Sequence, residues 1–187
     1  MAFLTLEELG KLNFKYIGEN VKISDKSSIY GAENISIDNN VIISDYTVIS
    51  GKVTIGRNVY ISVHCLLQGG NQGITISSFA SISSGVHIFA ESDDQSGQYL
   101  TNPTIPSEYK NTIGKSVFIG NHAIIGSQSI IYPGVLIGDG ASISAKSMQT
   151  TNAKEWSVYF GIPSEKIKDR NKDLLVLEKK YLESINQ

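Results

Sequence analysis

The sequence is poor in cysteine, with Cys65 the only one among 187 residues. A single cysteine cannot form a disulfide within the chain, and it cannot supply a zinc site built from several cysteines. A chain without disulfides suits a reducing compartment. We therefore expect a cytoplasmic location.

The sequence also lacks an excess of charge of either sign and a long apolar run. Sixteen Lys and Arg residues against eighteen Asp and Glu residues leave a net charge of -2. Because nucleic-acid binding needs a basic patch, we expect no nucleic-acid partner. No apolar stretch approaches the roughly 18 residues of a membrane-spanning helix. The first residues, MAFLTLEELGKLNF, include acids and lack the basic start of a signal peptide, so we expect neither a membrane span nor a secretory leader.

What the sequence does contain is an aliphatic residue at every sixth position between Ile113 and Met148. The positions are Ile113, Ile119, Ile125, Ile131, Ile137 and Ile143. A helix would place its apolar residues three and four positions apart, and a half-buried strand would place them at every second position. A second series of small or aliphatic residues stands four positions after each of these, at Val117, Ala123, Ser129, Val135, Ala141 and Ser147. Such hexapeptide repeats are typical of a parallel β-helix, in which very short strands alternate with tight corners.

The same period runs through the first half of the chain. Its residues are Ile17, Ile23, Ile29, Ile37, Ile43, Ile49, Ile55, Ile61, Leu67, Ile76, Ile82 and Ile88. Each set of three is predicted to form one triangular turn with the large side chains inside. Glycines after the isoleucines, such as Gly120 and Gly126, are expected to bend the corners through backbone angles that residues with a Cβ avoid. The repeat pauses after Ile88, which predicts an extended loop at about residues 90–112; such a long excursion is usually functional or disordered.

The two ends of the chain are predicted to be helical. Thr5 and Glu8 have the spacing of a capping box, which indicates a short helix over residues 5–12 that covers the open end of the coil. From Pro163 onward the apolar residues form one broad face, which predicts a C-terminal α-helix. The expected fold is thus mainly β, with a parallel β-helix domain at residues 1–162 and a helix at residues 163–187.

The segment IGNHAIIGSQSIIYPGVLIGDGASISAKS, followed by YFGIPSEKIKDR, resembles the closing part of the hexapeptide-repeat acyltransferases. These are left-handed parallel β-helix enzymes that use acetyl-CoA, and the resemblance covers the chain from about Ile17 to its C-terminal helix. Galactoside, maltose and O-antigen or nucleotide-sugar acetyltransferases are the most similar members. The resemblance implies acetyl-CoA as co-substrate and a homotrimer with active sites between subunits. It also implies transfer to a hydroxyl or amine of a sugar or nucleotide-linked sugar, in surface polysaccharide biosynthesis.

The resemblance also implies which residues bind the cofactor. Ser127 and Ala145 match positions whose backbone contacts the pantetheine arm, and Thr150 follows at a matching position. The closing G-x-P motif places cations for the CoA phosphates, to which Lys and Arg form charge-assisted hydrogen bonds. These cations are Lys166, Lys168 and Arg170.

Catalysis is less clearly indicated, because Asp93 stands where the galactoside and maltose enzymes have a catalytic histidine. An aspartate with an ordinary pKa of about 3.9 is a weak base, and burial or a neighbouring acid such as Asp94 or Glu91 would raise that pKa. Asp93 or Asp94 could serve as base or hold a substrate amine. Alternatively His122, at a corner expected to face the neighbouring subunit, supplies the base, or an amine acceptor needs less help.

The acceptor is expected to contact Gln68, Asn71 and His87, which the resemblance places at the same cleft. A different class of function is a non-catalytic β-helix or a γ-carbonic-anhydrase-like metal protein. His64, His87 and His122 supply three histidines, as such a site needs, but none shows the H-x-x-x-x-H spacing. We therefore predict no metal site.

Overall fold

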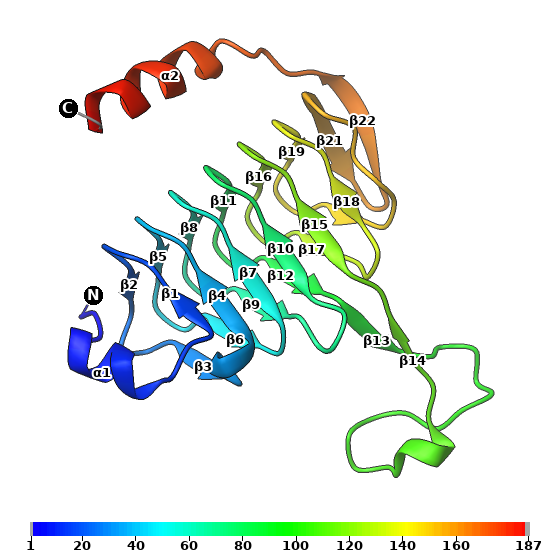
Figure 1. Cartoon of the computed structure of the whole chain (residues 1–187). Coiled ribbons are helices and arrows are strands. Elements are labelled where there is room, and N and C mark those ends of the chain that lie inside the picture. Colours follow the sequence, from blue (N-terminus) through cyan, green and yellow to red (C-terminus); the bar gives the residue numbers. More distant parts are fainter. Residues whose placement is uncertain (1, 186–187) are drawn as a thin grey trace.

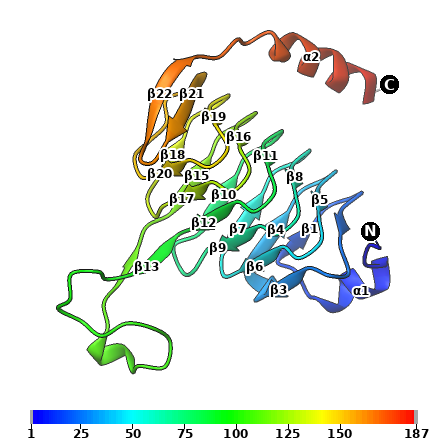
Figure 2. The same cartoon turned by 180° about the vertical axis from the view of Figure 1, so that it is seen from behind.

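The computed structural model describes residues 2–185, and its strands form a parallel β-helix with a triangular cross-section. Figures 1 and 2 show short strands stacked in successive coils from β1 to β20. The first sheet contains β1 (Tyr16–Ile17), β4 (Ile35–Ile37), β7 (Val53–Ile55), β10 (Ile74–Ile76), β15 (Val117–Ile119) and β18 (Leu136–Ile137). The second contains β2 (Lys22–Ile23), β5 (Ile42–Ile43), β8 (Tyr60–Ile61), β11 (Ser81–Ile82), β16 (Ile124–Ile125), β19 (Ser142–Ile143), β21 (Ser157–Gly161) and β22 (Ser164–Asp169). The third contains β3 (Ser28–Tyr30), β6 (Val48–Ser50), β9 (Leu66–Gln68), β12 (His87–Phe89), β17 (Ile130–Ile131) and β20 (Met148–Gln149).

The six-residue repeat sets both the register and the core. Equivalent residues pair from coil to coil, as Ile76 does with Ile119 across the long loop. From Ile37 to Ile143 the large side chains of the repeat that lie inside the coil are 0% or 1% exposed, whereas Ile29 in an outer coil is half-buried. The small second series is equally buried at Ala123 and Ala141. Burial of one such isoleucine contributes about 1.5–3 kcal/mol. The predicted parallel β-helix is confirmed.

The expected role of the corner glycines is wrong. The corner residues with left-handed backbone are others, such as His122 (φ 56°) and Gln128 (φ 60°). Gly126 is instead required by space, because a Cβ there would lie 2.7 Å from the carbonyl carbon of Ser144 in the next coil. At this corner the two coils pass so close to one another that a glycine is needed.

The repeat resumes later than predicted, because Ile113 lies outside the coil. It belongs to β14 (Thr112–Gly114), which pairs antiparallel with β13 (Glu91–Asp93) and places Ile113 opposite Ser92. Ile113 is 44% exposed, whereas Ile119 is fully buried. This two-stranded ribbon carries the long loop away from the coil, with a short 3-10 helix η2 (Ser107–Tyr109) at its far part (Figure 1).

The C-terminal helix also begins later than predicted. Strand β21 continues the second sheet beyond β19, and β22 returns antiparallel to it, so that the β-structure ends at Asp169 rather than at residue 162. Residues 157–161 form a strand because their backbone pairs with β19; for example, the N–H of Ser144 donates to the carbonyl of Tyr159. The apolar pattern used to predict a helix does not reveal this backbone pairing. Helix α2 spans Leu174–Ile185; residues 186–187 of the predicted helix lie outside the described residues.

The N-terminal helix is confirmed. Helix α1 (Leu6–Lys11) begins after Thr5, whose side chain and that of Glu8 form the expected capping box. Leu9 is 6% exposed and belongs to the core of the first coil, so the helix covers the open end of the coil. A short 3-10 helix, η1 (Ala32–Asn34), follows the first coil. Between residues 2 and 185 neither α-helix has the length and apolar character needed to cross a membrane.

Candidate functional site

The three sheets meet at three corners, which serve to locate the candidate residues. We call the corner between the first and second sheets the first corner, that between the second and third sheets the second corner, and that between the third and first sheets the third corner. The long loop lies between β12 of the third sheet and β15 of the first, so it leaves the coil at the third corner.

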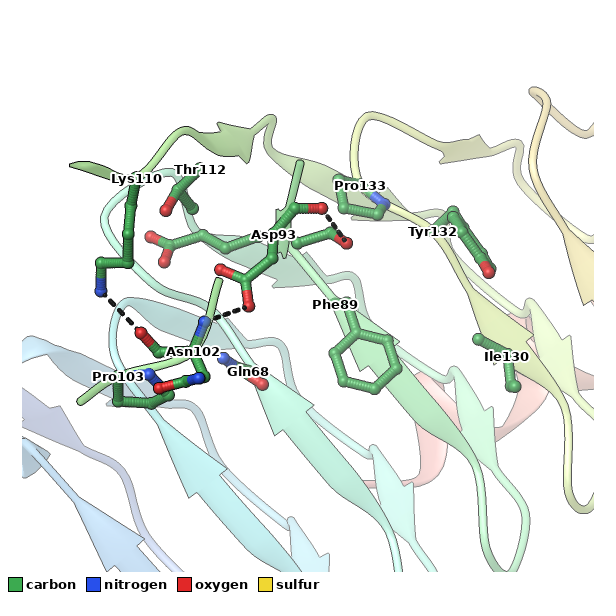
Figure 3. Close-up of a pocket in the computed structure, with 12 residues that line it drawn as sticks. Gln68, Phe89, Asp93, Asn102, Pro103, Lys110, Thr112, Ile130, Tyr132 and Pro133 are labelled. Atoms are coloured by element: carbon green, nitrogen blue, oxygen red, sulfur yellow. Dashed lines mark hydrogen bonds between the residues drawn. The ribbon is translucent and has the colours of Figure 1, made fainter. Parts of the chain in front are cut away.

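A hollow of about 460 Å³ lies between this loop and the outer face of the third sheet (Figure 3). We call it the loop pocket. Its lining residues come from β9, β12, the β13–β14 ribbon, the loop, β17 and the turn after β17. They are Gln68, Phe89, Glu91, Ser92, Asp93, Asn102, Pro103, Lys110, Thr112, Ile130, Tyr132 and Pro133.

One side of the loop pocket is apolar. Phe89 follows the buried Ile88 and therefore points outward from β12. Its neighbour in the sheet is the segment of Ile130 and Tyr132, because β12 pairs with β17. His87 packs edge-on against Phe89 with ring centroids 6.1 Å apart, but it stands beside the loop pocket rather than among its lining residues.

The other side is polar and is organised around Asn102. The carboxylate of Asp93 accepts a hydrogen bond from the backbone N–H of Asn102 at 3.1 Å. The ammonium of Lys110 donates to the backbone carbonyl of the same residue, also at 3.1 Å. Asp93 and Lys110 thus bind the backbone N–H and the backbone carbonyl of Asn102, whose backbone is left-handed (φ 74°). Asp93 and Gln68, which were expected at one cleft, both line this pocket.

Asp94 is directed elsewhere. Its two oxygens accept hydrogen bonds from the N–H of Ser96 and the side-chain amide of Asn111, both at 2.7 Å. Hydrogen bonding by Ser96, through its side chain and its N–H, and by Asn111 stabilises the charged carboxylate and lowers the pKa of Asp94. Asp94 borders a separate hollow beside Tyr99, so Asp93 is the aspartate of the pair that faces both spaces.

Glu91 fixes the glycine-rich turn below the loop pocket. Its carboxylate accepts a hydrogen bond from the N–H of Asn71 at 2.6 Å. The same carboxylate occupies the space that a side chain at Gly70 would need. Asn71 therefore contributes a backbone contact here, while its side chain is absent from the lining of the loop pocket.

The structure does not bring His122 to these residues. His122 lies at the first corner, where its ring stacks on Phe79 with centroids 5.1 Å apart. Its Nε2 atom lies 3.1 Å from a carboxylate oxygen of Glu178 in α2, and its side chain is 11% exposed. His122 borders a second hollow beneath α2, together with Tyr181.

The expected pantetheine residues lie together at the second corner. Ser127 and Ala145 belong to successive coils, joined by the hydrogen bond from the N–H of Lys146 to the carbonyl of Ser127 at 2.8 Å. Ala145 is exposed, as is Thr150 just after β20. The outer face of the third sheet connects this corner to the loop pocket.

The three expected cations have different surroundings. Lys166 forms an ion pair with Asp169 at 2.6 Å, and Lys168 is exposed on β22. Arg170 donates two hydrogen bonds at 2.9 Å to the carbonyls of His122 and Gly140, and partial burial lowers its pKa. The geometry therefore uses Arg170 to fasten the chain before α2 to the first corner.

The histidines do not meet within the chain. His64 lies at the second corner, stacked on Tyr46 at 5.0 Å between ring centroids, whereas His87 lies on the third sheet and His122 at the first corner. Among residues 2–185 no group of three or more possible metal ligands occurs.

Sequence reasoning missed most residues that line the loop pocket, among them Phe89, Lys110 and Tyr132. Phe89 carried a detectable signal, since an aromatic residue directly after an inward isoleucine must face outward at the start of the loop. Lys110 carried none, because its position depends on how the loop folds back on itself.

Comparisons with known proteins agree with this geometry. The protein-family model described as "Bacterial transferase hexapeptide (six repeats)" matches residues 116–148. An Escherichia coli dTDP-4-amino-4,6-dideoxy-D-glucose acyltransferase is 45% identical over 181 residues, which cover 95% of this chain and 94% of the relative.

Two solved structures come from Bacillus cereus. AntD, an N-acyltransferase in complex with dTDP and 3-hydroxybutyryl-CoA, has a TM-score of 0.97 and 45% identity, covering 99% of this chain and 98% of that one. A variant of AntD in complex with dTDP-4-amino-4,6-dideoxyglucose and Coenzyme A has a TM-score of 0.95 and 44% identity, with 97% of each chain covered. The chain belongs to the hexapeptide-repeat acyltransferase family.

Proposed function

We propose that the protein transfers an acyl group from acyl-CoA to the amine of a dTDP-linked 4-amino-4,6-dideoxy sugar. The observation that carries this proposal is the match, over almost the whole of both chains, to a solved N-acyltransferase bound to dTDP and an acyl-CoA. The match covers 99% of this chain and so takes in the long loop, the part of the chain in which acceptor specificity is expected to lie.

The chemistry suits an amine acceptor. The neutral amine attacks the thioester carbonyl, a C–N bond forms, and the nitrogen of the tetrahedral intermediate becomes positively charged and strongly acidic. The C–S bond then breaks and the CoA sulfur leaves as a thiol or thiolate. A carboxylate such as that of Asp93 can accept the proton from this nitrogen, although it would be a weak base towards a sugar hydroxyl. An aspartate at the position of the usual histidine is therefore consistent with nitrogen as the nucleophile.

The arrangement of the corners supports a path for the co-substrate. A CoA thioester whose pantetheine arm follows Ser127 and Ala145 at the second corner would reach the loop pocket across the outer face of the third sheet.

We further propose a homotrimer in the cytoplasm that makes a precursor for surface polysaccharide. The long loop extends away from its own coil (Figures 1 and 2), which leaves it available to a neighbouring subunit. Light scattering coupled to size-exclusion chromatography tests the assembly, and a monomeric mass would contradict it.

The function is tested by incubating the purified protein with dTDP-4-amino-4,6-dideoxyglucose and acetyl-CoA. Release of the CoA thiol and formation of the N-acetylated sugar nucleotide, detected by mass spectrometry, are expected. The matched control acceptor is dTDP-glucose, which carries a hydroxyl at the same carbon. Equal transfer to both acceptors would indicate an O-acetyltransferase and contradict the proposal. Replacement of acetyl-CoA by 3-hydroxybutyryl-CoA determines the preferred acyl chain.

A further inference from the structure

The loop pocket contains one cation and two carboxylates. Among the described residues that line it, Glu91 and Asp93 carry the negative charges and Lys110 carries the positive charge. Both carboxylates already accept a backbone hydrogen bond, from Asn71 and Asn102 respectively. Within residues 2–185 Lys110 makes no ion pair.

The ammonium of Lys110 has unused donors. A lysine side chain offers three N–H donors, and the carbonyl of Asn102 takes one of them at 3.1 Å. Lys110 is half-buried, so its remaining donors are partly removed from solvent. A half-buried cation with free donors at a pocket wall is well suited to bind an anionic oxygen.

The order of groups along the loop pocket matches the chemistry of a sugar diphosphate. Figure 3 shows Asp93 between Lys110 on one side and the apolar residues Phe89 and Tyr132 on the other. In a 4-amino hexose diphosphate the amine at C4 lies across the ring from C1, which carries the phosphate. An amine at Asp93 therefore leaves the phosphate on the Lys110 side and the thioester on the apolar side.

Charge favours the same orientation. Without Lys110 the lining would present only Glu91 and Asp93 to an incoming diphosphate, and like charges at such distances repel. We propose that Lys110 binds the diphosphate of the acceptor and makes the loop pocket select nucleotide-linked amino sugars over free ones. This inference rests on the proposed function for the identity of the acceptor.

The test compares three variants at Lys110. Lys110→Met removes both the charge and the bond to Asn102, Lys110→Gln retains a donor without the charge, and Lys110→Arg retains both. Lys15→Met, at an exposed position in the first coil, is the matched control for loss of one positive charge. Binding of dTDP and of thymidine is measured by calorimetry for each protein, and KM values for the acceptor and for acetyl-CoA are measured separately.

We expect Lys110→Met and Lys110→Gln to weaken dTDP binding by about tenfold or more. Binding of thymidine and KM for acetyl-CoA should change little. Lys110→Arg and Lys15→Met should bind dTDP nearly as the unaltered protein does. A merely structural role for Lys110 would weaken dTDP and thymidine equally and would spare Lys110→Gln.

Unchanged dTDP binding in Lys110→Gln would overturn the inference, whatever the activity of the enzyme. The proposed function fails separately, if the unaltered protein transfers no acyl group to the dTDP-linked amine. The binding measurement and the transfer assay therefore give distinct answers.

Discussion

The Nε2 atom of His122 lies 3.1 Å from a carboxylate oxygen of Glu178, which connects the first corner of the coil to α2. The ring of His122 also stacks on Phe79, which in turn packs edge-on against Tyr181 of the same helix. Together with the two carbonyl contacts of Arg170, these interactions hold α2 against the coil. His122 is therefore a residue that docks the helix.

This arrangement predicts that His122→Ala lowers stability more than turnover. Loss of the bond to Glu178 and of the stacking on Phe79 should lower the free energy of unfolding by about 1–2 kcal/mol, with kcat changed less than about twofold. Urea unfolding at fixed protein concentration and a transfer assay measure the two effects. A large fall in kcat with the native stability preserved would instead support the catalytic role that the sequence suggested.

Asp93 and Asp94 are expected to differ when each is changed to asparagine. Asp93→Asn removes the proton acceptor but keeps an oxygen for the N–H of Asn102, so kcat should fall by about 100-fold or more while KM for acetyl-CoA is retained. Asp94→Asn should have a smaller effect on kcat, because Asp94 serves Ser96 and Asn111. Steady-state kinetics measure kcat for both variants. A larger fall in kcat for Asp94→Asn than for Asp93→Asn would assign the proton transfer to Asp94.

The lowered pKa of Asp94 predicts how the loop responds to acid. A carboxyl whose pKa is lower in the folded state stabilises the structure above its unfolded pKa, and this contribution is lost as the pH falls through the folded value. The N–H of Ser96 should therefore stay protected from hydrogen exchange at neutral pH and become exposed only in acid, below the ordinary pKa range of an aspartate. NMR measurement of amide exchange tests this, with Asp94→Asn as the pH-independent control.

The fold was predictable because its information is local. Every sixth side chain must enter the core, so the spacing of residues such as Ile119 and Ile125 predicts the coil without information about neighbouring coils. The prediction was wrong where the chain leaves that rule. Ile113 continues the spacing but pairs with Ser92 in the ribbon, and residues 164–169 form a strand because β21 offers an edge. The expectation of a left-handed coil came from the family resemblance, since a six-residue period does not determine handedness.

The candidate site was predictable only in part, for a related reason. Gln68 and Asp93 were placed by the family resemblance, and both line the loop pocket. Lys110 and Tyr132 could not be placed, because outward positions and loop residues are free of the constraint that burial imposes. Arg170 was expected to bind phosphate, and in the structure its Nη1 atom donates to two backbone carbonyls, which the repeat does not predict.

The close stacking of the corners predicts a large cost for Gly126→Ala. The new Cβ would meet the backbone of the next coil at Ser144 and Ala145, which cannot move without disturbing the sheet. We expect the free energy of unfolding to fall by about 2 kcal/mol or more. Gly10→Ala is the matched control, because Gly10 lies in α1 with no atom within 4 Å of the added Cβ; it should raise stability by about 0.5–1 kcal/mol. Equal effects of the two changes on the thermal midpoint would contradict this account.

Gln149 offers the sharpest contrast between pattern and structure. It occupies the inward position that pairs with Ile131, so the repeat alone predicts that Gln149→Ile restores an ideal core residue. The structure predicts the opposite. The amide of Gln149 donates to the carbonyl of Thr151 at 2.8 Å and accepts a hydrogen bond from the buried hydroxyl of Ser164, and so joins the last coil to β22.

The buried hydroxyl of Ser164, left unpaired, costs about 1–3 kcal/mol, and the carbonyl of Thr151 loses its partner as well. The gain from an isoleucine is at most about 1.5–3 kcal/mol and smaller here, because the aliphatic part of glutamine is already buried. Gln149→Ile should therefore lower the free energy of unfolding, by about 1–2 kcal/mol. Adding Ser164→Ala removes one of the unpaired groups, so the double variant should be more stable than Gln149→Ile alone. Urea unfolding of the two single variants and the double variant measures the coupling. Additive losses would show that Gln149 and Ser164 act independently and that the end of the coil is held by the β21–β22 pairing alone.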